Sequence, residues 1–173
     1  MKSNTLEKAR KIKLVLTDCD GVLTDTGTYY SARGEEMKRF SIRDGMGTER
    51  LRKFCNIETG IVTGENSGIV SRRAEKLNIT EVHLGIKDKG TLVKEIAERL
   101  ELSLEEIAFI GDDTNDLEIM KLVGLTACPS DATRFAKEIS DLIVESKGGQ
   151  GAFRDFAEFI IEANMKKENK DSL

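Results

Sequence analysis

Short apolar runs alternate with amphipathic, helix-like segments along most of this chain of 173 residues. The run IKLVLT at 12–17 precedes the helix-like GTERLRKFC, and the run IETGIVT precedes the helix-like IVSRRAEKLN. Such alternation is typical of βαβ units, in which helices connect parallel strands. We therefore expect an α/β fold with a doubly wound parallel sheet. The pattern continues with strand-like segments at 81–84, 108–110, LTAC and LIVE, and with helix-like segments at 89–100 and 115–123.

One segment interrupts the alternation directly after the first strand. Residues 28–31 and 37–40 are strand-like and flank a turn that contains Gly34, which predicts a β-hairpin inserted at about 22–40. No internal repeat or linker divides the rest of the chain, so we expect a single domain over 1–173. The charged end KKENKDSL, at about 166–173, is expected to be frayed.

Composition and charge exclude several classes of function. A net charge of −4 offers no basic face for nucleic acid. The N-terminus lacks the apolar core of a signal peptide and no apolar run is long enough to span a membrane, so we predict a cytoplasmic protein. The three cysteines form no CxxC pair, and the single histidine, His83, rules out a multi-histidine zinc site.

Polar residues follow three of the predicted strands at the point where each strand ends. Asp18 and Asp20 follow LVLT, Thr63 follows the run IV, and Asp112 follows FIG. In open α/β sheets the ligand crevice lies outside the carboxyl ends of the strands, so we expect these side chains to converge. Strands ~4.8 Å apart place three neighbouring ends within roughly 10 Å, which leaves room for one phosphoryl group and one metal ion.

The carboxylates in these motifs indicate a hard metal ion. In DCDG, Asp18 and Asp20 are two residues apart, so in an extended backbone both side chains lie on one face. Together with GDDTND at 111–116, they would repel one another unless a cation were present. Oxygen ligands without histidine select Mg²⁺ rather than zinc or copper. Lys89 supplies a second positive charge from another loop.

Four motifs carry a resemblance to a known superfamily. DCDGVLTD, IVTG, the final lysine of KDK and GDDTND resemble the motifs of the haloacid dehalogenase (HAD) phosphatases, in the same order across about residues 12–130. The resemblance implies a HAD-like fold, with Asp18 as a nucleophile that forms an aspartyl-phosphate and Asp20 as general acid and then base. It further implies phosphate binding by Thr63, Gly64 and Lys89, Mg²⁺ binding by Asp18, the backbone carbonyl of Asp20 and Asp112, and support by Asp113 and Asp116.

The chain has no room for the cap domain that many HAD enzymes carry, because 21–62 and 64–88 hold little besides the hairpin, two helices and a strand. Within the superfamily, GVLTD, RRAEKL and GGQGAFRD resemble the tetrameric phosphatases of 3-deoxy-octulosonate 8-phosphate and of nine-carbon ulosonate 9-phosphates. In that family the hairpins build the tetramer core and a neighbouring subunit covers the site. The resemblance therefore implies a homotetramer, with the segment Gly148 to Arg154 closing a neighbouring site.

The segment after the second strand bears on substrate choice. Where octulosonate enzymes usually have Arg after the TG, this chain has Glu65, which is similar to the ketodeoxynononate and N-acylneuraminate 9-phosphate phosphatases. Arg73 and Lys76 match substrate-contacting positions of that subgroup. The resemblance implies a 2-keto-3-deoxy sugar acid phosphate, preferably a nine-carbon 9-phosphate, with 3-deoxy-D-manno-octulosonate 8-phosphate as the alternative. These three residues fit a solvated helix face with ordinary charge pairs equally well.

Two other functions stay open at this point. Signalling receiver domains also gather acidic residues, a Thr and a Lys around Mg²⁺ and a phosphorylated Asp, but their acceptor Asp lies near the third strand. Here DxD comes first and GDD last, which argues against a receiver. A non-catalytic sugar-phosphate-binding module would keep the fold without turnover, yet all the implied catalytic positions are present, which favours an enzyme.

Overall fold

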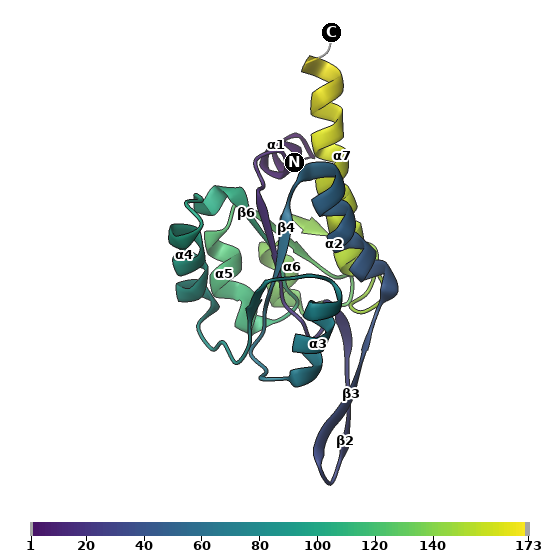
Figure 1. Cartoon of the computed structure of the whole chain (residues 1–173). Coiled ribbons are helices and arrows are strands. Elements are labelled where there is room, and N and C mark those ends of the chain that lie inside the picture. Colours follow the sequence, from purple (N-terminus) through teal and green to yellow (C-terminus); the bar gives the residue numbers. More distant parts are fainter. Residues whose placement is uncertain (1, 172–173) are drawn as a thin grey trace.

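The centre of the computed structural model, which describes residues 2–171, is a six-stranded sheet in the order β5-β4-β1-β6-β7-β8 (Figure 1). Neighbouring strands are parallel throughout this sheet. The doubly wound α/β fold expected from the alternation is therefore confirmed. The strands are β1 (Leu14–Thr17), β4 (Glu58–Val62), β5 (Glu81–His83), β6 (Ile107–Ile110), β7 (Leu125–Cys128) and β8 (Leu142–Ile143).

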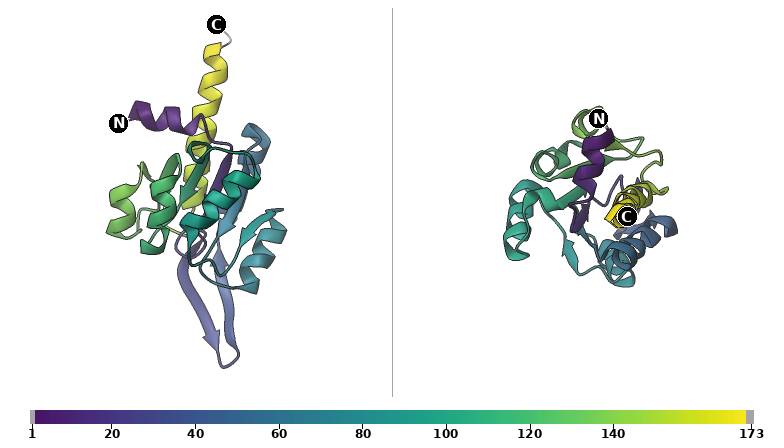
Figure 2. Two further views of the ribbon diagram at one scale, coloured as in Figure 1. Left: turned by 90° about the vertical axis from the view of Figure 1, so that its left-hand side faces the viewer. Right: turned by 90° about the horizontal axis from the view of Figure 1, so that it is seen from above.

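Helices cover both faces of the sheet (Figures 1 and 2). Because side chains alternate along a strand, Val15 packs into the core on one face, while Leu14 and Leu16 pack into the core on the other. The first face is covered by α1 (Lys2–Ala9), α2 (Ile42–Cys55), α3 (Gly68–Lys76) and α7 (Ala152–Asp171). The second is covered by α4 (Lys89–Arg99), α5 (Leu117–Leu122) and α6 (Arg134–Ile139).

A hairpin of β2 (Thr24–Ser31) and β3 (Gly34–Phe40) projects from the body of the molecule (Figures 1 and 2). The two strands pair antiparallel, as the sequence predicts for residues 22–40. Tyr29, Tyr30 and Met37 on this hairpin are 62%, 70% and 59% exposed. The described part of the chain thus leaves an apolar surface on the hairpin uncovered.

Several boundaries differ from the expectations. The sequence pattern does not predict the helices α1 and α6. The helix α2 begins at Ile42, before the segment predicted as helical, because the Ser41 side chain caps it by accepting a hydrogen bond from the Arg43 amide. The helix α7 continues to Asp171, consistent with the strong helix propensity of Lys and Glu. Fraying of the end at about 166–173 stays a prediction. Residues 172 and 173 lie outside the described part. Between residues 2 and 171, no helix has both the length and the apolar character to cross a membrane.

Candidate active site

The carboxyl ends of β1, β4 and β6 meet at one edge of the sheet. Thr17 is paired with Ile61 of β4 on one side and with Ile110 of β6 on the other. Asp18 extends this register, since its amide donates a hydrogen bond to the Ile110 carbonyl at 3.0 Å. The side chains that follow these strands are therefore brought to one edge of the sheet, as expected for the switch point of a doubly wound sheet.

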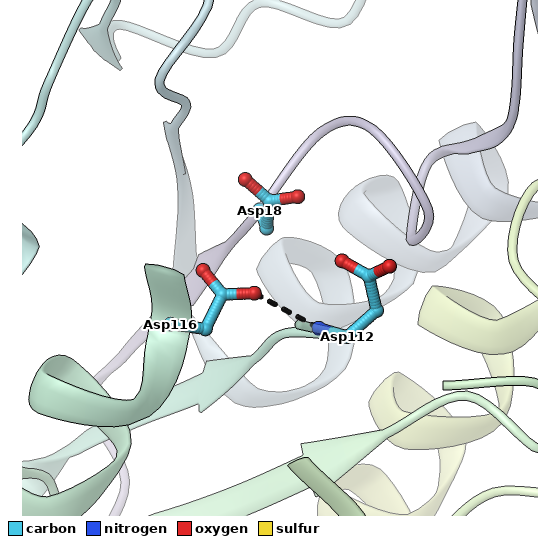
Figure 3. Close-up of side chains that lie close together, drawn as sticks. All are labelled: Asp18, Asp112 and Asp116. Carbon is cyan, nitrogen blue, oxygen red and sulfur yellow. Dashed lines mark hydrogen bonds between the residues drawn. The ribbon is translucent and has the colours of Figure 1, made fainter. Parts of the chain in front are cut away.

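Three aspartates converge at this edge. Asp18, Asp112 and Asp116 each offer a carboxylate oxygen within 4.8 Å of the others, and Figure 3 shows their side chains gathered together. Asp18 is 3% exposed and Asp116 is fully buried. The loop after β1 can approach this closely because residue 21 is glycine: it has a φ of +98°, and a Cβ there would lie 2.1 Å from Asp112 Oδ2.

Lys89 joins two of these aspartates from a different element. It is the first residue of α4, a helix that begins here because the Asp88 side chain accepts a hydrogen bond from the Thr91 amide at 2.8 Å. The Lys89 ammonium, with a 1% exposed side chain, lies 2.5 Å from Asp18 Oδ1 and 2.6 Å from Asp116 Oδ1. A buried ammonium so placed is stabilised only by such partners.

Asp116 and Asp113 hold the loop after β6 in place. Asp116 Oδ2 accepts hydrogen bonds from the backbone amides of Asp112 at 2.9 Å and of Asp113 at 3.4 Å. With Oδ1 bound to Lys89, both oxygens of Asp116 have partners. Asp113 is exposed, and its side chain accepts a hydrogen bond from the Thr114 amide at 2.6 Å. Both residues thus stabilise the loop around Asp112, and their supporting role in metal binding stays a prediction.

The charge of the cluster is not balanced by protein groups alone. Burial, together with the charge of Asp116, raises the pKa of Asp18 to about 7 against the opposing effect of Lys89. Burial and the charges of Asp18 and Asp116 raise the pKa of Asp112 to about 8. Neighbouring carboxylates repel one another in this way when only one ammonium faces them. A divalent cation bound to carboxylate oxygens would remove this repulsion, and the all-oxygen donor set suits Mg²⁺.

Asp20 lies beside this cluster and faces the hairpin. Its carboxylate accepts hydrogen bonds from Lys38 Nζ on β3 at 2.7 and 2.8 Å, and from Thr24 Oγ1 at 3.2 Å. Burial opposes the charge on Lys38, but the hydrogen bond and charge of Asp20 outweigh it and raise the pKa of Lys38. Sequence analysis did not single out Lys38, because nothing in its local sequence distinguishes it from the other lysines.

Thr63 and Gly64 lie at the end of β4, next to β1 in the sheet. Thr63 is buried, and its amide donates to the His83 carbonyl at 3.0 Å. Its hydroxyl accepts a hydrogen bond from the Glu65 amide at 3.2 Å, and the Gly64 carbonyl accepts one from Lys87 Nζ at 3.1 Å. The hydroxyl and the loop backbone are therefore at the same edge of the sheet as Asp18.

The three predicted substrate-binding residues lie on α3 and in the loop before it. Glu65 is exposed in the loop before α3, and Lys76 is exposed at the last residue of that helix. Arg73 donates a hydrogen bond to the Ser41 carbonyl at 2.8 Å, and its guanidinium lies 5.5 Å from the centre of the Phe40 ring. Within this chain Arg73 thus fastens α3 to the end of the hairpin, a contact that no sequence pattern reveals. Substrate binding by these three residues stays a prediction.

The segment 148–154 packs against the loop of the first motif in its own chain. The Gly149 amide donates to the Val22 carbonyl at 2.9 Å, and a Cβ on Gly148 would lie 2.0 Å from the Gly21 carbonyl oxygen. The Arg154 amide donates to Asp44 Oδ1 at 3.0 Å, and its side chain pairs with Glu158. Glycine is needed here for close backbone contact, and closure of a neighbouring site stays a prediction.

Known proteins share both this sequence and this architecture. The family model of haloacid dehalogenase-like hydrolases matches residues 49–154. The 3-deoxy-D-manno-octulosonate 8-phosphate phosphatase KdsC of Haemophilus influenzae is 35% identical over 166 residues, which cover 96% of this chain and 92% of the relative. The chain belongs to the KdsC family of HAD-type hydrolases. Its members among these relatives are named as phosphatases, so the predicted superfamily and enzyme class are confirmed.

Solved structures of KdsC-family members agree with the fold. One of them is the 3-deoxy-D-manno-octulosonate (KDO) 8-phosphate phosphatase from Moraxella catarrhalis, which was solved with a magnesium ion, a phosphate ion and a KDO molecule. Its structure matches with a TM-score of 0.92 at 32% sequence identity, and the match covers 99% of this chain and 98% of the relative. The cobalt-bound phosphatase from Haemophilus influenzae has a TM-score of 0.88 and 36% identity, covering 92% of each chain. These relatives carry eight-carbon substrate names, so they do not support the predicted closeness to the nine-carbon phosphatases.

Proposed function

We propose that this chain is a Mg²⁺-dependent phosphatase of 3-deoxy-D-manno-octulosonate 8-phosphate (KDO 8-phosphate). The observation that carries the proposal is the placement of Asp18: a buried carboxylate between the Lys89 ammonium and Asp112, at the edge of the sheet where ligands bind. A carboxylate in a crevice that also attracts a cation suits attack on a phosphate ester, whose negative charge must be neutralised before a nucleophile can approach.

The first half of the reaction depends on two aspartates. A carboxylate oxygen of Asp18 attacks phosphorus and the ester P–O bond breaks. Asp20, which takes up a proton before this step, gives that proton to the departing sugar oxygen. Thr63, Gly64 and Lys89 hold the phosphoryl oxygens, on which charge builds during transfer.

Asp18, Asp112 and the carbonyl of Asp20 would hold Mg²⁺, with Asp113 and Asp116 in support. The bound ion supplies positive charge to the phosphoryl oxygens.

The second half releases phosphate. Asp20, now deprotonated, takes a proton from water, which attacks the phosphorus of the Asp18 aspartyl-phosphate and frees both phosphate and the Asp18 carboxylate. Splitting the hydrolysis into two displacements lowers each barrier. Asp20 can serve both steps because its carboxylate is partly exposed, with 25% of the side chain accessible.

The eight-carbon substrate is proposed because KdsC relatives that cover most of this chain are named for KDO 8-phosphate, and one of them was solved with KDO. A nine-carbon ulosonate 9-phosphate is the second candidate. It is favoured by one residue, Glu65, which stands where octulosonate enzymes usually have Arg. Either substrate is a sugar acid whose hydroxyls and carboxylate are recognised by hydrogen bonds and opposite charge.

The proposal also covers the form of the protein: a single-domain cytoplasmic enzyme that assembles as a homotetramer.

A side-by-side turnover assay tests the substrate. The protein is given Mg²⁺ and either KDO 8-phosphate or N-acylneuraminate 9-phosphate, and inorganic phosphate is measured over a range of concentrations. We expect a kcat/KM for KDO 8-phosphate at least tenfold above that for the nine-carbon acid. The reverse order would transfer the function to the nine-carbon class. Failure to hydrolyse either would overturn the proposal.

A further inference from the structure

Lys38 is a buried cation outside the set of residues that the four motifs supply. It lies on β3, its side chain is 2% exposed, and its ammonium contacts both oxygens of Asp20 at 2.7 and 2.8 Å. Removing an ammonium from water is costly unless it meets an opposite charge. The position of Lys38 is therefore set by Asp20, although the two residues belong to different elements.

A partner within the hairpin is also available to Lys38. Glu35 lies on the same strand, and its Oε2 is 3.3 Å from the ammonium, farther than either oxygen of Asp20. If the ammonium served only to stabilise the hairpin, Glu35 would suffice as its partner. The shorter contacts go instead to the residue with the proposed acid–base role.

Glu35 extends the contact to a second catalytic loop. Its Oε1 accepts a hydrogen bond from the hydroxyl of Ser67, which is 4% exposed and precedes α3 in the loop that follows Thr63. A continuous chain of polar contacts therefore runs from Asp20 through Lys38 and Glu35 to Ser67. It connects the loop after β1 with the loop after β4 by way of the hairpin.

The geometry points to Lys38 as a positioning residue that fixes the orientation of the Asp20 carboxylate for proton transfer. Contact with both oxygens, together with the Thr24 hydroxyl on Oδ1 at 3.2 Å, restricts rotation of the carboxylate. A general acid acts only within hydrogen-bond reach of the leaving oxygen, so a freely rotating carboxylate would lose rate without losing substrate. This inference rests on the proposed function, because it takes Asp20 as the acid.

The variant Lys38→Met tests the inference because it keeps an unbranched side chain of similar length and removes the ammonium. Two esters are compared with the enzyme in excess over substrate, so that the first displacement is observed. KDO 8-phosphate has an alkoxide leaving group that needs a proton, whereas p-nitrophenyl phosphate has a leaving group that departs without one. We expect the alkyl ester to lose about 30- to 300-fold in rate and the aryl ester less than fivefold. KM for the alkyl ester should stay within twofold.

Two further variants complete the experiment. Lys38→Arg restores a donor cation and should recover at least tenfold of the lost rate on the alkyl ester. Arg39→Met is the matched control: Arg39 neighbours Lys38 on β3 and pairs with Asp25, so its loss perturbs the hairpin without touching Asp20. We expect this control to keep both rates. If Lys38→Met does not fold, Lys38→Gln takes its place.

Two results would overturn the inference: equal losses on both esters, or an unchanged rate on the alkyl ester. Failure of the proposed function is distinguishable, because it would show in the wild-type protein as absent turnover of KDO 8-phosphate. In that case glycerol 2-phosphate replaces the alkyl ester, and the comparison of leaving groups still decides the role of Lys38.

Discussion

The aspartate cluster and the β2–β3 hairpin are built in opposite ways. The cluster is formed at the ends of central strands, with Asp18 and Asp116 buried and Lys89 between them. The hairpin projects from the body (Figure 2), and its Tyr29, Tyr30 and Met37 side chains are exposed. Strand register and core packing therefore place the aspartates and Lys89, whereas Tyr29, Tyr30 and Met37 of the hairpin lie outside the core. Disruption of the aspartate cluster should stop the reaction, and substitutions outside the cluster should change its rate or its substrate preference.

Loss of the nucleophile should have the largest effect. We expect Asp18→Asn to lower phosphate release by more than about 1,000-fold, because an amide cannot form the aspartyl-phosphate. The change is close to isosteric, so circular dichroism should show a folded protein. Binding of Mg²⁺ should persist more weakly through Asp112. Wild-type turnover in this variant would remove Asp18 from its proposed role.

Removal of the metal ion should have the second-largest effect on turnover. We expect a chelator such as EDTA to stop turnover and added Mg²⁺ to restore it, because the clustered carboxylates otherwise repel both one another and the substrate phosphate. Phosphate release is measured before chelation, after it, and after Mg²⁺ is added back in excess. A rate that the chelator does not change would contradict the metal assignment.

A substitution outside the aspartate cluster should have a smaller effect on catalysis. We expect Glu65→Arg to shift the ratio of kcat/KM values toward eight-carbon over nine-carbon substrates by about tenfold, the effect of one polar contact. Glu75→Arg is the matched control, because Glu75 is exposed on α3 and pairs with Arg72. An unchanged ratio in Glu65→Arg would show that Glu65 does not select the substrate.

The smallest effect on turnover is expected at Asp44, where α2 meets the start of α7. Burial raises the pKa of Asp44 to about 6, although the backbone amides of Arg154 and Gly151 favour the charged carboxylate. Since this pKa lies above the ordinary value of 3.8, the protonated carboxyl adds stability at low pH that is lost as the pH rises through about 6.

The variant Asp44→Asn removes this titration. The difference in unfolding free energy, wild type minus variant, should therefore fall by about 2 kcal/mol between pH 4 and pH 7. Urea denaturation at several pH values between these limits measures it. A difference that does not change with pH would contradict the assignment, and kcat should stay near that of the wild type throughout.

Much of the fold and of the aspartate cluster could be predicted because both depend on local patterns. Alternating runs define the strands, and the position of Asp18 and Asp112 directly after two strands brings them together once those strands are neighbours. The relationship between the two aspartates follows from periodicity and sheet topology. Lys89 enters the candidate site through the resemblance of KDK to a HAD motif and not through periodicity.

The remaining contacts depend on long side chains that reach between elements distant in sequence. Lys38 reaches Asp20 from the hairpin, and Arg73 reaches the Ser41 carbonyl from α3. No periodicity encodes such contacts, because they depend on how the hairpin and α3 are placed over the sheet. For the same reason, the contacts of Arg73 with Ser41 and Phe40 are known from the structure alone, and its substrate-binding role stays a prediction.

The strand order has a consequence for protein synthesis. β1, which leads into Asp18, lies between β4 and β6, and β6 leads into Asp112. While the chain is being translated, the nucleophile leaves the ribosome long before the strand that completes its surroundings. A nascent chain that ends before β6 therefore has no enclosed site for a phosphate ester. Ribosome-bound chains should acquire phosphatase activity only after the second half of the sheet has emerged.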